Sequence, residues 1–400
     1  NAPKYGAPLF AAGFVGSGGL PGHVVVAGGG GSGSTGVLNR VLLLEADPEG
    51  TLDPEPIAEA ATGSAAPVKG AVAPNGGALV AALSGGGIRS FRLAGADAKE
   101  VAEGKEEGLG GAEAKCLAFT PGSELLAVGL ESGDLRVFAW PSLQPRGTVE
   151  GAAEGGVSSI AFGPLFSAAA GSEEGGEGED EHAGWPMGVV SSSGALSFWT
   201  LRKDGEGAEE VGEAVLPRSH SGSAVKGCGW GAAAGDVFTG LHGKKTLVAA
   251  WDVATRIPAR TAVAFAEGRI SAFACWGGEG SKSLVAAGSS EGEVKVFDGR
   301  TLSALLKVPK AHMIFVTEIA IASDGRAVLS TSADASARCS MVPESRFTPE
   351  FLFAALVVGM AVIFFLFLQL DNYMQQFEVT SLEPELGWHP ANPFGGGLSK

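Results

Sequence analysis

The chain of 400 residues contains 63 glycines and 21 prolines, but only 18% of its residues are charged. Long amphipathic surface helices need many Glu, Lys, Arg and Gln residues, so this composition favours short strands joined by glycine turns. The hydrophobic fraction of 45% provides for a large core and excludes wholesale disorder. The formal net charge of −16 argues against the basic surface that nucleic acids require, so no nucleic acid partner is expected.

Residues 1–343 contain a weak internal repeat. Each copy has an apolar strand, a small turn, a second apolar strand, a Gly/Asp/Ser turn and a strand that ends in an aromatic residue. Most copies are spaced near the ~40–45 residues of a four-stranded propeller blade, which predicts an all-β, seven-bladed, WD-repeat-like β-propeller. The copies lie at residues 5–47, 68–93, 115–140, 157–201, 225–253, 270–298 and 314–342.

Aromatic residues near corresponding strand ends are expected to pack between blades, because a ring of sheets buries each sheet against its neighbours. They are Phe91, Phe138, Trp199, Trp251 and Phe297. Trp251–Asp252 is the single literal Trp-Asp dipeptide, so the repeat signature is degenerate.

Several polar features of the repeats are predicted to be structural. His312 and Asp334 are predicted to join a hydrogen-bond network inside the last blade. The acidic segments 171–182 and 203–212 are expected to be solvated loops, since high net charge disfavours packing. The cysteines lie far apart, without a Cys-x-x-Cys pair, and are expected to be free thiols rather than disulfides or zinc ligands; they are Cys116, Cys228, Cys275 and Cys339.

Residues 351–370 form an uncharged apolar run, FLFAALVVGMAVIFFLFLQL. A helix of about 20 residues spans the ~30 Å hydrocarbon layer of a bilayer, so this run predicts a single C-terminal transmembrane helix after a juxtamembrane linker at 344–350. Basic residues precede the run and acidic residues follow it, which places the propeller in the cytosol and residues 371–400 in the lumen. Nothing near residue 1 resembles a secretory signal, so a type II topology is expected.

No catalytic constellation is evident, and the chain is not expected to be an enzyme. Residues 288–292, GSSEG, match the Gly-x-Ser-x-Gly string of serine hydrolases. That motif requires a strand-to-helix turn, whereas a further strand, EVKVF, follows here. The match is therefore predicted to be a hairpin turn.

A glycine-rich segment between two apolar strands stands apart from the other turns. Gly28, Gly30 and Gly33 fit Gly-x-Gly-x-x-Gly, but a dinucleotide-binding turn opens a helix, and a strand follows this one. A Walker loop is excluded as well, because Val37 and Leu38 stand where Lys-Ser or Lys-Thr would be required. Two interpretations remain, a flexible glycine hairpin and a shaped protruding loop whose converging carbonyls could hold a cation.

At this segment the sequence resembles the Sec-twelve / prolactin regulatory element-binding protein family, the endoplasmic-reticulum exchange factors for the Sar-type small GTPase of COPII coats. The resemblance rests on residues 24–40, VVVAGGGGSGSTGVLNR, on YGAPLF at 5–10 and on KAHMIFVTEIAIASDGRAVLS at 310–330. The order of a seven-bladed propeller and one membrane anchor is also similar. The resemblance implies a single-pass protein of the endoplasmic-reticulum membrane.

The resemblance further implies that the first-blade loop docks on the Sar-type GTPase and drives nucleotide release, with COPII or cargo proteins as additional partners. Asn39 matches an asparagine that contacts the GTPase in the family, and Pro67 matches a secondary proline near the same face. A potassium ion held by loop carbonyls is implied in the same way, and no other cofactor is required. The implied contact loop comprises Gly28, Gly29, Gly30, Gly31, Ser32, Gly33, Ser34, Thr35, Gly36, Val37, Leu38 and Asn39.

Two alternatives share this architecture. One is an exchange-inactive relative that helps a membrane cargo, such as a phosphate transporter, to leave the endoplasmic reticulum. Val37 and Leu38 replace the family's usual Ile-Pro, which favours this alternative, whereas the retained Asn39 favours exchange. The other is a membrane-tethered scaffold without a GTPase partner.

Overall fold

The computed structural model describes residues 2–16, 20–31, 36–93, 101–165, 184–233, 235–278, 282–343 and 349–380. The chain divides into two compact units, residues 1–343 and residues 344–400. The acidic segment 171–182 and the predicted tail from residue 381 onward lie outside the described residues.

The first unit contains seven antiparallel sheets that follow one another along the chain. The sheets of the first four blades are built from β1 (Leu9–Val15), β2 (Gly22–Gly28), β3 (Arg40–Ala46) and β4 (Ala58–Ala61); β5 (Pro67–Val72), β6 (Ala78–Leu83), β7 (Gly87–Leu93) and β8 (Val101–Gly108); β9 (Ala114–Phe119), β10 (Leu125–Leu130), β11 (Leu135–Ala139) and β12 (Gln144–Val149); β13 (Val157–Phe162), β14 (Gly184–Ser191), β15 (Leu196–Arg202) and β16 (Ala208–Glu213).

The remaining three blades complete the ring. They consist of β17 (Ala224–Trp230), β18 (Val237–His242), β19 (Thr246–Asp252) and β20 (Ile257–Phe265); β21 (Ile270–Gly277), β22 (Ser283–Ser289), β23 (Val294–Asp298) and β24 (Ala304–Val308); β25 (Val316–Ile321), β26 (Ala327–Ser332) and β27 (Ala337–Met341). A short 3₁₀ turn, Arg218–His220, precedes β17.

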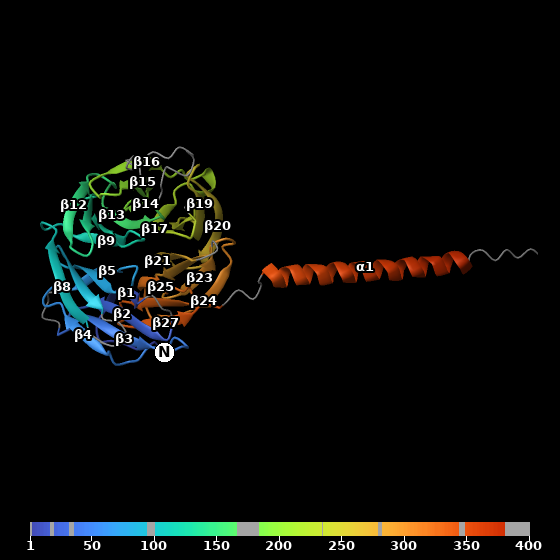
Figure 1. Ribbon diagram of the computed structural model, residues 1–400, viewed down its shortest axis with the longest axis horizontal. Coiled ribbons are helices and arrows are strands. Elements are labelled where there is room, and N and C mark those ends of the chain that lie inside the picture. Colours follow the sequence, from blue (N-terminus) through green and yellow to red (C-terminus); the bar gives the residue numbers. More distant parts are fainter. Residues whose placement is uncertain are drawn as a thin grey trace, which may run out of the picture. The chain divides into compact units, whose positions relative to one another are not determined.

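The sheets surround a central axis, with the first strand of each blade nearest the centre (Figure 1). Each of these inner strands packs against the inner strand of the next blade, and β25 returns to β1. The predicted seven-bladed β-propeller is therefore confirmed. The Gly288–Gly292 match falls at the end of β22 and in the β22–β23 turn, which confirms the hairpin.

Burial is highest in the second strand of a blade, lower in the inner strand that lines the channel, and lowest in the outer strand, as in β5, β6 and β8. β6, β10, β22 and β26 are buried at every position, because both faces of these strands meet a neighbouring blade. The described residues form seven hydrophobic clusters, each between two adjacent blades. The predicted interblade aromatics all belong to these clusters, so their packing role is confirmed.

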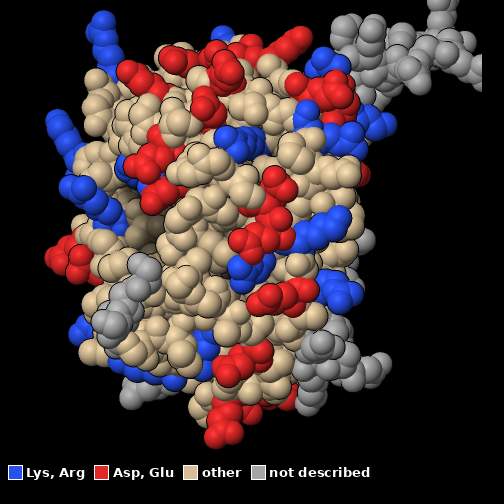
Figure 2. All heavy atoms as spheres, turned by 90° about the vertical axis from the view of Figure 1, so that its left-hand side faces the viewer, with Lys and Arg blue, Asp and Glu red and all other residues tan. Residues whose placement is uncertain are grey.

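The outer strands carry charged side chains. On the side where β8 and β12 lie, acidic and basic residues are interspersed (Figure 2). The expectation of a loop throughout 203–212 was wrong, because β16 occupies Ala208–Glu213 and pairs with β15. An outermost strand faces solvent, so its acidic side chains remain hydrated while its backbone bonds to one neighbour.

The ring closes between the two ends of the propeller sequence. Blade seven has three strands, and the segment before β1 runs antiparallel to the start of β27. The Tyr5 amide donates to the carbonyl of Ala335 at 2.9 Å, and the Ala337 amide donates to Pro3 at 3.3 Å. Blade seven thereby receives backbone hydrogen bonds from the residues that lead into blade one.

The described residues of the second unit form helix α1 (Pro349–Thr380), which begins before the predicted span at 351–370 and continues beyond it. The apolar side chains described between residues 356 and 370 are exposed. Within the described part of the chain, no helix has the length and apolar character required to cross a membrane.

Candidate functional site

The β2–β3 connection of blade one differs in length from its counterparts. It occupies residues 29–39, whereas the corresponding turns of blades two to seven occupy 84–86, 131–134, 192–195, 243–245, 290–293 and 333–336. A short turn is sufficient to join these strands, so the fold itself does not need the extra length. Long loops carried by a rigid scaffold are frequent sites of binding.

Asn39 fixes the base of this loop. Its side chain is only 6% exposed. The Gly31 amide donates to Asn39 Oδ1 at 3.0 Å, and Asn39 Nδ2 donates to the carbonyls of Gly31 and Gly63, both at 3.0 Å. The Asn39 carbonyl in turn accepts a hydrogen bond from the Thr62 amide at 2.9 Å. One residue therefore joins the two ends of the loop to the segment that leads into blade two.

The glycines at the start of the loop permit this close packing. A Cβ atom on Gly29 would overlap the Asn39 side chain and would lie 2.7 Å from Asn39 Cα. A Cβ atom on Gly28 would overlap the carbonyl of Pro8. The Gly29 amide donates to that same carbonyl at 3.0 Å, which attaches the loop to the residue before β1. Only glycine fits at these two positions, so the loop leaves the sheet along a defined path.

Exposure increases away from the base. Gly29 is buried, Gly31 is half-buried and Gly36 is exposed. Leu38 is 66% exposed, although its neighbour Asn39 is buried. Ser32, Gly33, Ser34 and Thr35 belong to the predicted contact loop and lie outside the described residues. The described part of the loop combines a hydrogen-bonded base with an exposed apolar side chain.

Pro67, the predicted secondary site residue, is the first residue of β5 and is buried. It follows the segment that Asn39 contacts through Gly63. The Thr62 hydroxyl donates to the carbonyl of Ala65 at 2.7 Å, which shapes the path from Gly63 to Pro67. The structure thus places Pro67 on the segment that supports the loop base, rather than on an exposed surface.

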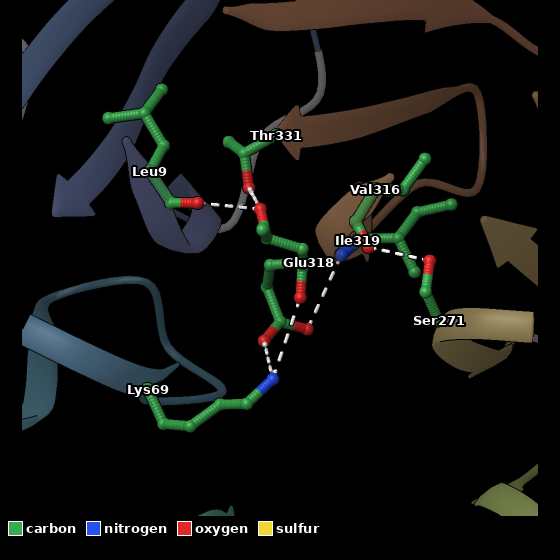
Figure 3. A network of polar contacts seen from close by, with 8 residues as sticks. Leu9, Lys69, Ser271, Val316, Glu318, Ile319 and Thr331 are labelled. Atoms are coloured by element: carbon green, nitrogen blue, oxygen red, sulfur yellow. Dashed lines mark hydrogen bonds and ion pairs between the residues drawn. The ribbon is translucent and has the colours of Figure 1, made fainter. Parts of the chain in front are cut away.

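A polar network ties four blades together around the central channel (Figure 3). Lys69 on β5 reaches Glu318 on β25, with a distance of 3.5 Å between Lys69 Nζ and Glu318 Oε2. The Thr317 hydroxyl donates to the carbonyl of Leu9 at 2.6 Å, and Ser271 Oγ donates to Val316 at 2.7 Å. Blades two and seven are therefore joined across blade one, the blade that carries the glycine-rich loop.

The predicted internal network of the last blade is confirmed. His312 is 4% exposed, with its Nδ1 atom 2.6 Å from Ser336 Oγ and its Nε2 atom 2.8 Å from Ser330 Oγ. Asp334 accepts hydrogen bonds from the Ser336 hydroxyl and from the Met313 amide. Burial, opposed by the charge of Asp334, lowers the pKa of His312 to about 4. A neutral, hydrogen-bonded histidine of this kind serves the packing of the blade.

The cysteines are free thiols, as expected. Burial raises the pKa of Cys116 and of Cys228 to about 12, so neither is a reactive thiolate at neutral pH. Among the described residues, no group of three or more His, Cys, Asp or Glu side chains could hold a metal ion.

The residues that sequence reasoning missed are those that hold the loop. The Gly63 carbonyl accepts a hydrogen bond from Asn39 Nδ2, and the Thr62 amide donates to the Asn39 carbonyl. Nothing in the local sequence of these two residues predicts that they contact the loop. Lys69 and Glu318 are also brought together only by the closed ring. The excess of glycine identified the loop itself, because no strand or short turn requires so many glycines.

Comparisons with known proteins find one similar curated protein and many solved structures of the same fold. No family model matches the sequence. It is 26% identical over 333 residues to SEC12-like protein 2 of Arabidopsis thaliana, covering 78% of this chain and 74% of that protein. This similarity confirms the resemblance predicted from the sequence.

Solved structures show the same fold. A chain of the COPII outer coat vertex on membranes has a TM-score of 0.64 at 15% identity, with 87% of both chains covered. A chain of the COPII coat assembled on membranes has the same TM-score and identity, and the match covers 87% of this chain but 48% of that one. At this level of identity the likeness concerns the fold alone.

Proposed function

We propose that this Sec12-like β-propeller is a guanine-nucleotide exchange factor that activates a Sar-type small GTPase at the endoplasmic reticulum and so starts COPII coat formation. The observation that carries the proposal is the junction of Leu38 and Asn39, where an exposed apolar side chain adjoins a buried amide that fixes the loop base. Similarity to a SEC12-like protein over most of the chain supports the same function.

An exchange factor performs no covalent chemistry. It binds the nucleotide-free GTPase more tightly than the GDP-bound form and shifts the population towards release. A GTPase holds GDP through phosphate-loop amides, a lysine and Mg²⁺, so the factor must supply contacts that compete with this set. A loop that is already fixed at its base loses less conformational entropy on docking. In this chain the hydrogen bonds of Asn39 provide that fixation, and Leu38 provides apolar contact area.

The role of Asn39 in this proposal is therefore positional. Its side-chain amide is occupied by Gly31 and Gly63, so it orders the loop that meets the GTPase. The family resemblance had instead implied a direct contact. In our proposal the exposed residues Gly36 and Leu38 take over the direct contact.

A potassium ion in the loop remains a prediction. Loop carbonyls are suitable ligands for a hard cation. The Gly31 carbonyl accepts one hydrogen bond from Asn39 Nδ2 and keeps a second lone pair, so it and the other loop carbonyls are candidate ligands. If a bound potassium ion supports the loop, exchange should be faster in potassium chloride than in lithium chloride of equal ionic strength.

We further propose that residues 351–370 anchor the chain in the endoplasmic-reticulum membrane as a single-pass type II protein. The run is uncharged and forms part of helix α1. An anchor would keep the activated GTPase beside the bilayer from which the coat is assembled. Resistance to alkaline carbonate extraction, with residues 1–343 accessible to protease from the cytosolic side, is the expected outcome.

The exchange proposal is tested with the full chain in nonionic micelles and a Sar-type GTPase loaded with fluorescent GDP. The wild-type chain should accelerate GDP release by at least tenfold. Leu38→Asp should remove most of this acceleration, because a charged group replaces the exposed apolar contact. Val263→Asp is the matched control, since Val263 is 53% exposed on the outer strand β20, away from the loop.

The possible results separate the proposal from its alternatives. Loss of exchange in Leu38→Asp alone supports the proposed contact. If the wild-type chain binds the GTPase or coat proteins without accelerating release, it acts as a traffic facilitator and the exchange proposal is overturned. Equal loss in both variants would show that Leu38 has no specific part.

A further inference from the structure

The inner strands share an irregularity that brings particular side chains to one level of the central channel. In all seven blades the pairing between the first two strands shifts near the start of the inner strand. Such a bulge re-aims the side chain that it carries. Lys115, Lys226 and Ser271 occupy bulges, and Lys69 follows the bulge of β5 directly. The repeat therefore gathers polar side chains at one mouth of the channel.

This mouth lies on the face that also carries the glycine-rich loop. Leu9, at the start of β1, pairs with Gly28, where the loop begins. In blade three the residue before Lys115 pairs with Leu130, the last residue of β10. The starts of the inner strands and the β2–β3 type connections thus share one end of the propeller.

A cavity of about 290 Å³ occupies the mouth. Among its lining residues are Lys69, Lys115, Lys226, Ser159, Ser271 and Glu318. The lining contains three lysines and one carboxylate, so its net charge is positive, although the whole chain carries a net charge of −16. A volume just under the roughly 300–1,000 Å³ of small-molecule pockets suits an ion or a headgroup rather than a folded peptide.

The three lysines differ in their partners. Lys69 is paired with Glu318 at 3.5 Å, and Lys115 is paired with Glu113 and Glu131 at 3.4 and 3.2 Å. Lys226 forms no ion pair with any carboxylate of the described residues. A half-buried lysine that has no counter-ion among the described residues is a favourable position for an anion, because binding would satisfy its charge.

A second basic residue, Arg269, lies in the neighbouring blade. His242 ends β18, and Arg269 immediately precedes β21. Burial and then the charges of Arg269 and Lys226 lower the pKa of His242, so both cations lie close enough to act on it. Arg269 directly precedes Ile270, which lines the cavity beside Lys226, so its charge adds to the positive potential near this side of the cavity.

We propose that this cavity binds a phosphate group, with Lys226 as its principal ligand and Lys69 and Lys115 as additional donors across the channel. Ammonium groups are established phosphate ligands, and a phosphate carries several acceptor oxygens that lysines from different blades can share. The phosphate can belong to a free ion or to a phosphorylated lipid headgroup. The site is separate from the glycine-rich loop and does not depend on the exchange activity.

The test uses the full chain in nonionic micelles and isothermal titration with inorganic phosphate and with pyrophosphate. A third arm measures binding to micelles doped with phosphatidylinositol 4-phosphate. Saturable binding is expected, with an affinity that falls as sodium chloride is raised. Lys226→Gln should weaken binding at least tenfold, and Lys226→Arg should change it by less than about threefold. The matched control is Lys282→Gln, which removes the same charge beside the first residue of β22, at the opposite end of the strands.

Each result supports or overturns the proposal. Binding of the soluble ions identifies a free phosphate as the ligand, whereas binding only to doped micelles identifies the headgroup. Absence of saturable binding in all three arms overturns the site. Equal weakening by Lys226→Gln and Lys282→Gln overturns it as well, because the effect would then be one of net charge. Matching melting temperatures of the variants exclude unfolding as the cause.

Discussion

The β2–β3 loop of blade one and the β26–β27 turn of blade seven hold equivalent places in adjacent blades, yet they are stabilised differently. The turn at 333–336 is held by its own side chains, since Asp334 Oδ1 accepts the Ser336 amide at 2.9 Å and the Ser332 hydroxyl accepts the Asp334 amide at 3.2 Å. The loop at 29–39 is held at its base by Asn39 and by the carbonyl of Gly63 in a separate connection. The turn also contacts its surroundings, since the Ala335 carbonyl accepts the Tyr5 amide and Asp334 accepts the Met313 amide, but its own side chains close it locally. The base of the loop depends on a hydrogen bond to a different connection.

This difference indicates what each segment does. The turn and its His312 network fill the interior of blade seven, so their hydrogen bonds contribute to stability. The loop adds length that the sheet does not require and carries an exposed leucine beside its buried amide. Substitutions in the turn should therefore change mainly the stability of the propeller, whereas substitutions in the loop should also change the rate of nucleotide exchange.

Asn39→Ala should have the largest effect. The substitution removes three hydrogen bonds at the loop base and leaves the carbonyls of Gly31 and Gly63 without their donor. At about 1 kcal/mol for each bond, the free energy of unfolding should fall by about 3 kcal/mol. Most of the acceleration of GDP release should also be lost, at a temperature where the propeller is still folded. Urea unfolding followed by tryptophan fluorescence and the GDP-release assay measure the two effects, and unchanged exchange would remove Asn39 from the mechanism.

Gly29→Ala should have a somewhat smaller effect for the same reason. The added methyl group would overlap Asn39 and force either the loop or the amide to move. Overpacking of this kind costs about 1–3 kcal/mol, and the displaced amide should also slow exchange. Gly108→Ala is the control, because a Cβ atom at Gly108 meets no atom within 4 Å. Equal behaviour of the two variants would contradict the role assigned to the close packing.

The sequence predicted the blades well because their pattern is local. Alternating apolar strands and glycine turns recur at blade spacing, and a strand buried on both faces appears as a continuous apolar run, as in β6 and β10. β16 was not predicted, because Ala208–Glu213 is an acidic outer strand. Its hydropathy pattern does not indicate that it pairs with β15.

The candidate site was predictable only in part. The run of glycines and Asn39 could be located, but the inward direction of the Asn39 side chain depends on Gly63, which lies in the connection to the next blade. The level of Lys69, Lys115 and Lys226 in the channel depends on bulges, which are set by strand pairing rather than by local composition. Contacts between distant segments require the closed ring, and a single sequence does not specify them.

His312→Gln should alter the pH dependence of stability in blade seven. The folded chain holds the pKa of His312 at about 4, below the ordinary value of about 6.5. The unfolded chain therefore takes up the proton first, so this contribution to stability is complete above pH 6.5 and is lost as the pH falls towards 4. Between pH 7 and pH 5 the loss should be about 2 kcal/mol in the wild-type chain. The His312→Gln variant should lack this loss when its free energy of unfolding is measured by urea unfolding at pH 7 and at pH 5. If the free energies of unfolding of the variant and the wild-type chain changed equally with pH, His312 would be excluded as the source of the loss.

Leu38→Asp should have the smallest effect on stability, although it adjoins Asn39. The leucine side chain is 66% exposed, so its replacement removes little buried surface, and the free energy of unfolding should change by less than about 0.5 kcal/mol. The same urea measurement gives this value, and the GDP-release assay should show most of the exchange lost. A destabilisation as large as that of Asn39→Ala would mean that Leu38 packs into the loop base. Asn39 could then no longer be distinguished as the supporting residue from Leu38 as the residue that contacts the GTPase.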